Sequence, residues 1–122
     1  MQIEISIAEI IDKLTILSLK KNKISDPNKL KNIEKEFDYL TGIINELKID
    51  SNDIHKLLDV NNLLWNIEDE IRNKERNQVF DEEFIHLARN VYITNDLRAE
   101  IKKKINIKYS SEFVEEKSYS KY

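Results

Sequence analysis

The sequence predicts an all-α protein, an antiparallel helical bundle of four main helices with a long C-terminal hairpin. Three observations lead to this prediction. The 122 residues contain one glycine and one proline, and both residue types interrupt regular structure. Apolar residues recur at three- and four-residue spacing through four segments, which is the pattern of a buried helix face. Short polar turns separate the segments, as an antiparallel bundle requires.

The first helix is expected to begin after Ser6, which stands at capping-box spacing before Glu9. Its apolar stripe consists of Ile7, Ile10, Leu14 and Leu17. The preceding stretch QIEIS alternates polar and apolar residues, a pattern compatible with a strand-like arm.

Asp26 and Pro27 begin the second helix as its N-cap and its first helical residue. The stripe of this helix consists of Leu30, Ile33, Phe37, Leu40, Ile44 and Leu47. Gly42 lies inside the helix, where glycine costs roughly 1 kcal/mol relative to alanine. We therefore expect either a neighbour packed very close to Gly42 or a bend in the helix.

The third helix is expected to run from the polar turn at 50–53 to about Asn77, with the stripe Leu57, Val60, Leu64, Ile67 and Ile71. The fourth begins at Asp81, with Phe80 and Ile85 placed as a hydrophobic staple. Its stripe begins with Phe84, Ala88 and Val91 and resumes at Ile101 and Ile105. At about 25 residues, or roughly 37 Å each, these two helices should form a long hairpin.

Composition predicts one helical domain over residues 1–122, with a polar C-terminal tail at 109–122. The net charge is −3 with both signs interspersed, which argues against a nucleic-acid partner. The chain has no cysteine, so it has no disulfide and no thiolate metal site. No apolar run approaches the ~18 residues of a membrane span, and the N-terminus lacks a basic leader. We therefore expect a cytoplasmic protein with no membrane partner.

A second row of side chains follows the core stripe of the third helix, about 100° around the helix axis. It consists of Trp65, Glu68, Arg72 and Glu75. Glu68 and Arg72 have the i, i+4 order that favours an ion pair on a helix surface. The row is therefore either a solvated helix edge, with Trp65 as a core-edge aromatic, or the lining of a site.

The fourth helix carries polar residues where its apolar stripe should continue, at Thr94, Asn95 and Arg98. An arginine on a core stripe must find a partner, because an unpaired buried charge is very costly. Either this end of the helix extends into solvent, or the residues form an enclosed polar patch. Because Ile101 and Ile105 resume the stripe, the sequence favours the enclosed patch.

Glu9 and Asp12 in the first helix have ExxD spacing, which places two carboxylates on one helix face. Carboxylates at this spacing can hold Mg²⁺ through their oxygens. The alternative is a solvated face on which Lys13 pairs with Glu9.

Several of these motifs together resemble a small bacterial and phage domain family of unknown function. They are ISIAEIIDKLTIL, LWNIEDEIRNKE, FDEEFIHLARNVYITNDLRAEIKKKIN and EEKSY, which extend over residues 5–119. Ala8 stands where the family's first helix is expected to have glycine. Members of this family also occur attached to larger proteins of the glycosyltransferase and tetratricopeptide-repeat kind. The resemblance brings no established activity, but it implies that the polar residues above belong to the family's pattern.

We expect a polar pocket between the first, third and fourth helices. Its predicted lining is Asp12, Trp65, Glu68, Arg72, Arg89, Asn95 and Arg98. Arginines offer planar forks to a carboxylate or phosphate, and Trp65 would supply a stacking wall. The leading hypothesis is a binding module, without a cofactor, for a small anionic or sugar-like ligand or for a partner protein.

Two alternatives come from other classes of protein. The first is a metal-dependent nucleotide pyrophosphohydrolase with Mg²⁺ as cofactor. Its candidate metal ligands are Glu9, Asp12, Glu68 and Asp69. The chain lacks a clear ExxE and ExxD pair in the expected order, which counts against this enzyme. The second alternative is a structural homodimer in which the polar row of the third helix forms intersubunit pairs.

Overall fold

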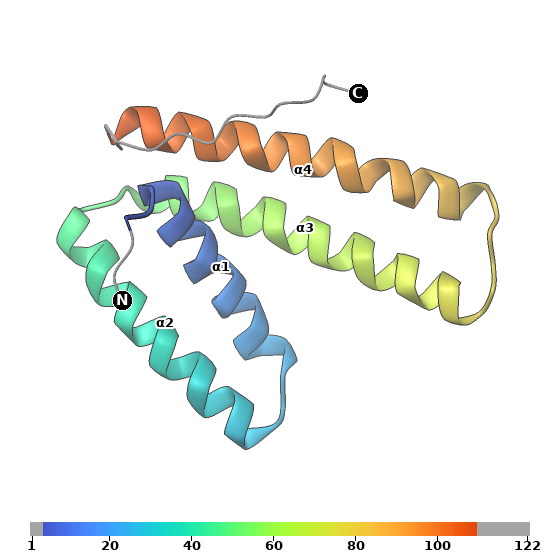
Figure 1. Cartoon of the computed structure of the whole chain (residues 1–122), viewed down its shortest axis with the longest axis horizontal. Coiled ribbons are helices and arrows are strands. Elements are labelled where there is room, and N and C mark those ends of the chain that lie inside the picture. The colour runs from blue at the N-terminus through green and yellow to red at the C-terminus, as the bar shows by residue number, and fades with distance from the viewer. Residues whose placement is uncertain (1–3, 110–122) are drawn as a thin grey trace.

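The computed structural model describes residues 4–109 as four helices arranged in two antiparallel hairpins (Figure 1). The helices are α1 (Ile7–Lys23), α2 (Pro27–Leu47), α3 (Ser51–Arg76) and α4 (Glu82–Lys108). The predicted all-α bundle and its long C-terminal hairpin are confirmed, since α3 and α4 contain 26 and 27 residues.

Two predictions concern the chain ends. Residues 4–6 are not a strand, so the described part of the QIEIS stretch does not form the strand-like arm with which its alternation is compatible. The start of that stretch, and the predicted tail beyond Tyr109, lie outside the described residues. None of the helices within 4–109 carries an apolar stretch long enough to cross a bilayer.

Side-chain caps begin all four helices at the expected residues. The capping side chains accept hydrogen bonds from backbone N–H groups of the first turn, which have no partner within the helix. The caps are Ser6 for α1, Asp26 for α2, Asp50 for α3 and Asp81 for α4. The local sequence therefore determines where each helix begins.

The central element is α1, which packs against each of the other three helices. In the described part of the chain, α2 packs against α1 alone, while α3 and α4 pack along each other. The core lies where α1 meets its neighbours, and Ala8, Ile11 and Leu57 have no exposed surface there. Each helix contributes buried apolar residues, as the striped pattern predicts.

The α3–α4 hairpin extends well beyond α1 (Figure 1). The C-terminal end of α1 reaches α3 at Trp65, where Lys23 Nζ lies 5.6 Å from the ring centroid. We call residues 66–97, the part of the hairpin on the turn side of this contact, the arm. Within residues 4–109, only α3 and α4 form the arm, so each of them has a wide face that no other described helix covers.

The arm also explains where the predicted stripe of α4 is wrong. Leu87 is buried, whereas Ala88 is exposed and Phe84 is only half-buried. Among the described helices, α3 alone covers this part of α4. The buried face of α4 is therefore narrower here than it is beside α1, and it is centred on Leu87. At the cap, the Phe80 ring packs edge-on against Phe84 with centroids 5.2 Å apart, and the expected staple residue Ile85 is largely exposed.

Two details of α2 also differ from expectation. Leu47, placed in the predicted stripe, is exposed at the last turn of the helix. A Cβ atom added at Gly42 would meet nothing within 4 Å, so no neighbour packs very close to this glycine. The glycine therefore has no packing role in the described structure.

We expect Gly42→Ala to raise the free energy of unfolding by about 1 kcal/mol, because alanine has less backbone freedom in the unfolded chain. Urea unfolding of the two proteins measures the difference. An unchanged or lower stability would mean that the added methyl group has a steric cost at this position.

Candidate functional site

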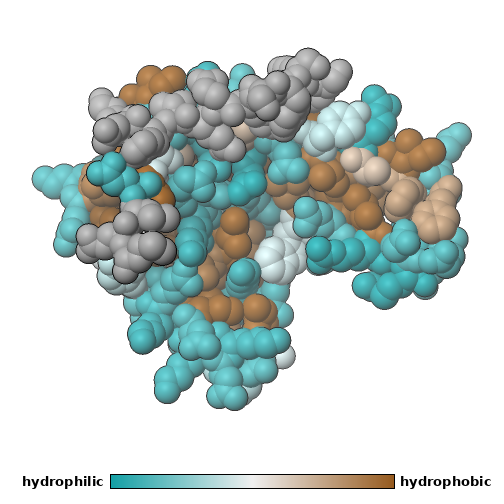
Figure 2. All heavy atoms as spheres, in the orientation of Figure 1, coloured by the Kyte–Doolittle hydropathy of each residue, from teal (hydrophilic) through white to brown (hydrophobic). Residues whose placement is uncertain are grey.

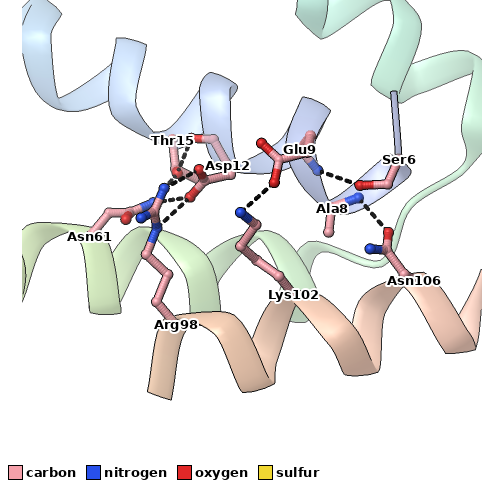
Figure 3. Close-up of polar contacts among 9 residues, drawn as sticks. All are labelled: Ser6, Ala8, Glu9, Asp12, Thr15, Asn61, Arg98, Lys102 and Asn106. Atoms are coloured by element: carbon pink, nitrogen blue, oxygen red, sulfur yellow. Dashed lines mark hydrogen bonds and ion pairs between the residues drawn. The ribbon is translucent and has the colours of Figure 1, made fainter. Parts of the chain in front are cut away.

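Side chains from α1, α3 and α4 form a buried polar cluster where these helices meet (Figure 3). The polar cluster consists of Asp12 and Thr15 on α1, Asn61 on α3 and Arg98 on α4. Asp12 is 4% exposed, and Thr15 and Asn61 are also buried. The Arg98 side chain is 27% exposed, so the cluster reaches the surface through this residue.

Asp12 receives hydrogen bonds on both carboxylate oxygens. Arg98 Nε donates to Oδ1 at 3.0 Å, and Arg98 Nη2 donates to Oδ2 in a bidentate ion pair. Asn61 Nδ2 donates to the same Oδ1 at 2.8 Å and also lies 2.8 Å from Thr15 Oγ1. Thr15 Oγ1 in turn donates to the Asp12 carbonyl oxygen at 2.7 Å. This geometry suits a charged pair that joins helices, because fork-to-fork contacts fix both distance and orientation.

A second layer of polar contacts continues from the cluster toward the start of α1 (Figure 3). Lys102, buried on α4, forms an ion pair with Glu9, so this carboxylate faces another helix rather than closing a capping box. The Ala8 N–H donates to Asn106 Oδ1 at 2.9 Å. Asn106 is 1% exposed, and its Nδ2 has no hydrogen-bond partner among residues 4–109, which lowers the stability of the fold.

The structure brings together two of the predicted site residues, Asp12 and Arg98. Asn95 is half-buried on α4, and Trp65 is half-buried against the end of α1. Three predicted residues lie exposed on the arm, away from the polar cluster: Glu68, Arg72 and Arg89.

Sequence reasoning missed two members of the polar cluster, Thr15 and Asn61. Thr15 lies three residues after Asp12, and Asn61 lies three residues before the core residue Leu64. Each therefore stands on a helix face that the stripe pattern already assigns to an interface. A search for polar residues bordering the stripe opposite Arg98 would have found them.

The predicted Mg²⁺ ligands do not come together. Glu9 is paired with Lys102 and Asp12 with Arg98, whereas Glu68 and Asp69 are exposed on the arm. Within residues 4–109, no group of three or more His, Cys, Asp or Glu side chains is placed to hold a metal ion. These four carboxylates therefore do not fit a magnesium site.

Comparison with known protein families identifies the family but not an activity. A model of a family of unknown function, DUF6165, matches residues 1–122. The chain belongs to this family. No curated protein and no solved structure matches the chain. A bacterial or phage source of DUF6165 proteins, and their attachment to larger proteins, stay predictions.

At the end of the hairpin opposite to the arm, this DUF6165 chain has a second polar cluster. Tyr109 Oη donates to Asp53 Oδ2 at 2.6 Å, and Lys108 Nζ lies 2.8 Å from the same oxygen. The Asp50 N–H donates to the Tyr109 hydroxyl at 2.9 Å. These contacts tie the end of α4 to the start of α3, so Tyr109, the first residue of the predicted tail, belongs to the fold.

Burial acts to raise the pKa of Asp53, but the hydrogen bonds from Lys108 and Tyr109 outweigh it and hold the pKa below its ordinary value of 3.8. The hydrogen bond to Asp53 raises the pKa of Lys108. Burial, followed by the hydrogen bond to Asp53, raises the pKa of Tyr109. The three groups therefore stabilise the end of the hairpin in their ordinary charge states at neutral pH.

A third polar group lies at the tip of the arm, where α3 turns into α4. Lys74 Nζ lies 3.1 Å from Asp81 and 3.3 Å from Glu83. The hydrogen bond to Asp81 raises the pKa of Lys74, and the Phe84 N–H, followed by Lys74, lowers the pKa of Asp81. A shallow depression here is lined by Glu70, Asn73, Lys74, Asn77, Val79 and Glu83. It has few apolar walls, unlike most small-molecule sites.

We expect Asp12→Ala to lower the free energy of unfolding by about 3 kcal/mol, because it leaves the Arg98 guanidinium without its carboxylate. Arg98→Met keeps the apolar stem but removes the charge. The double variant should cost less than the sum of the two single variants, and urea unfolding of the four proteins gives the coupling energy.

Glu68→Ala is the control for this cycle. Glu68 is exposed on the arm, so its removal should change stability by less than about 0.5 kcal/mol. Additive effects of the Asp12 and Arg98 changes would show that their ion pair does not hold the helices together.

A pH dependence follows from the lowered pKa of Asp53. Its ionised form stabilises the fold above its unfolded pKa, and this contribution is lost as pH falls through the lower folded value. We therefore expect Asp53→Asn to be less stable than the native chain near neutral pH, with the difference shrinking below about pH 4. Asp81 titrates in both proteins, so urea unfolding across this range isolates Asp53. A difference that does not change with pH would contradict the assignment.

Proposed function

We propose that this DUF6165 chain is a binding module that docks a partner protein on the arm. The proposal depends on one observation: most of the large apolar side chains that remain exposed lie on the arm. Of the eleven exposed within residues 4–109, six lie on the arm: Val79, Phe80, Ile85, Tyr92, Ile93 and Leu97. Figure 2 shows hydrophobic surface along the far end of the hairpin.

The exposure of these side chains is large. Phe80 is 53% exposed and Ile85 is 57% exposed. Removing this apolar surface from water would be favourable, and a covering partner would do so. Clustered apolar surface with a polar rim is typical of a protein-interaction site. Glu68, Arg72 and Arg89 are exposed on the same arm and supply such a rim. The predicted polar row of α3 then acts as the border of a docking surface.

The polar cluster supports the partner-protein form of the hypothesis over the small-ligand form. Asp12 and Arg98 already satisfy one another, so a small anion would have to compete with a buried carboxylate for the arginine fork. Arg72 and Arg89 lie on the arm, where a partner's carboxylates can reach them. The pyrophosphohydrolase alternative loses its support because its four carboxylates do not converge.

We expect the double change Ile85→Gln and Leu97→Gln to abolish docking, because it replaces exposed apolar side chains with polar ones. Tyr39→Gln is the matched control, since Tyr39 is exposed on α2 and outside the arm. Quantitative affinity capture from extract of the source cells compares the native chain with both variants. The proposal expects proteins that the native chain and the control retain but the arm variant loses. The same captured set for all three chains would overturn it.

A further inference from the structure

Two ends of the molecule carry opposite charge. The arm, residues 66–97, has eight acidic and four basic side chains, a net charge of −4. The turn between α1 and α2, together with the helix ends that flank it, spans residues 20–31 and has five lysines and one aspartate, a net charge of +4. We call this basic segment the corner. The whole chain has a net charge of only −3, so the two charged ends are a feature of charge placement and not of composition.

The corner and the arm project from the molecule in different directions (Figure 1). In the space-filling view, the outline is notched between the α1–α2 end and the arm (Figure 2). Lys23 in the corner contacts the half-buried Trp65, the residue directly before the arm. One side of the notch is therefore the basic corner, and the other side is the acidic arm. The exposed apolar residues of the arm lie in its turn and on α4.

We propose that a second copy of the chain occupies this notch, so that two molecules clasp each other about a two-fold axis. This inference rests on the proposed function and names the partner. In the clasp, the apolar surface of one arm packs against the same surface of the other arm. Each acidic arm also lies beside the basic corner of the other copy.

Two features of the chain favour a second copy over an unrelated partner. A two-fold interface brings one surface against itself, so an apolar arm supplies both halves of the contact. The chain also carries both members of a complementary charge pair, and two-fold symmetry forms the arm-to-corner contact twice. A foreign partner would have to provide both the apolar face and the basic segment.

The size of the arm shows why both kinds of contact are needed. The arm contains 16 residues of α4 and 11 residues of α3, and at 1.5 Å per residue these give lengths of roughly 24 Å and 17 Å. With each helix about 10 Å wide, the two helices present a face on the order of 400 Å². Stable interfaces bury about 800 Å² on each partner, so the arm alone falls short. The corner contacts supply the remainder, and the dimer should therefore be sensitive to charge.

Salt tests the electrostatic part of the clasp. Charges at the protein surface are screened over about 10 Å at 0.1 M salt and about 3 Å at 1 M. Sedimentation velocity of the full chain should show a dimer at about 50 mM NaCl and at least a tenfold weaker association at 0.5 M. A monomer at every salt concentration, up to several hundred micromolar protein, would overturn the proposal.

Exchanging the charges gives the sharpest test. One variant carries Glu68→Lys and Glu75→Lys on the arm, and the other carries Lys29→Glu and Lys31→Glu at the corner. All four side chains are exposed, so the fold should tolerate the changes. Each variant alone makes the arm or the corner neutral, removes the charge attraction from both arm-to-corner contacts and should be monomeric. An equimolar mixture regains one native contact, has the charges exchanged across the other, and should form a mixed dimer.

Circular dichroism establishes that both variants are folded. Loss of dimer in each variant without recovery in the mixture would overturn the reciprocal contact, because a change in folding alone is not rescued by mixing. Dimers that persist in the separate variants would also overturn it. The double change Ile85→Gln and Leu97→Gln should weaken the dimer, and Tyr39→Gln should not.

The clasp and the proposed function can fail separately. If the native chain is a monomer but the apolar arm variant still loses captured proteins, the clasp is wrong and the docking function stands. If the native chain is a dimer that the arm variant leaves intact, the arm is not the interface between copies and the clasp is wrong.

Discussion

The ion pair between Asp12 and Arg98 determines how the two hairpins of this protein fit together. A buried carboxylate must have a partner, and here its two oxygens match the fork of one guanidinium. Asn61 joins the same carboxylate from α3, so three helices meet at a single level. Apolar packing alone tolerates sliding of one helix along another, whereas this contact permits one register.

That register, together with the lengths of the helices, produces the arm. The central helix α1 has 17 residues, while α3 and α4 have 26 and 27. Arg98 meets α1 ten residues before the end of α4, so the covered part of α4 lies on its C-terminal side. The contact of Asp53 with Lys108 and Tyr109 closes the hairpin at that end. All the excess length of α3 and α4 must therefore project at the other end, as residues 66–97.

Local features of the fold could be predicted from the sequence, and contacts between helices could not. Each N-cap acts within one turn, so Ser6 and Asp26 mark their helices without reference to the rest of the chain. The interruption of the apolar stripe at Arg98 correctly predicted that this arginine has a partner, which is Asp12. Periodicity gives the face of a helix but not its level against a neighbour, so it could not choose between Glu68 and Asp12 as the acceptor.

The same limitation explains the ambiguous row of α3. Trp65 and Glu68 stand on neighbouring faces of one helix, yet Trp65 touches the end of α1 and Glu68 lies beyond it. Whether the row lines a site or a solvated edge depended on where α1 stops along α3. That position is a property of helix packing, which the Asp12 contact determines. In the fold, the row begins at Trp65, beside the end of α1, and continues onto the exposed arm.

A projecting pair of helices has a physical consequence for function. Two helices can bury one stripe each against the other, and stable domains cover their remaining apolar surface with a further layer. An ion pair between Lys74 and Asp81 stabilises the turn of the arm but does not cover the faces of the two helices. Ile85 and Leu97 nevertheless remain exposed, although glutamine or lysine there would serve an isolated helix equally well. Apolar residues in such positions are explained when another surface covers them, and the proposed clasp assigns this surface to a second copy of the chain.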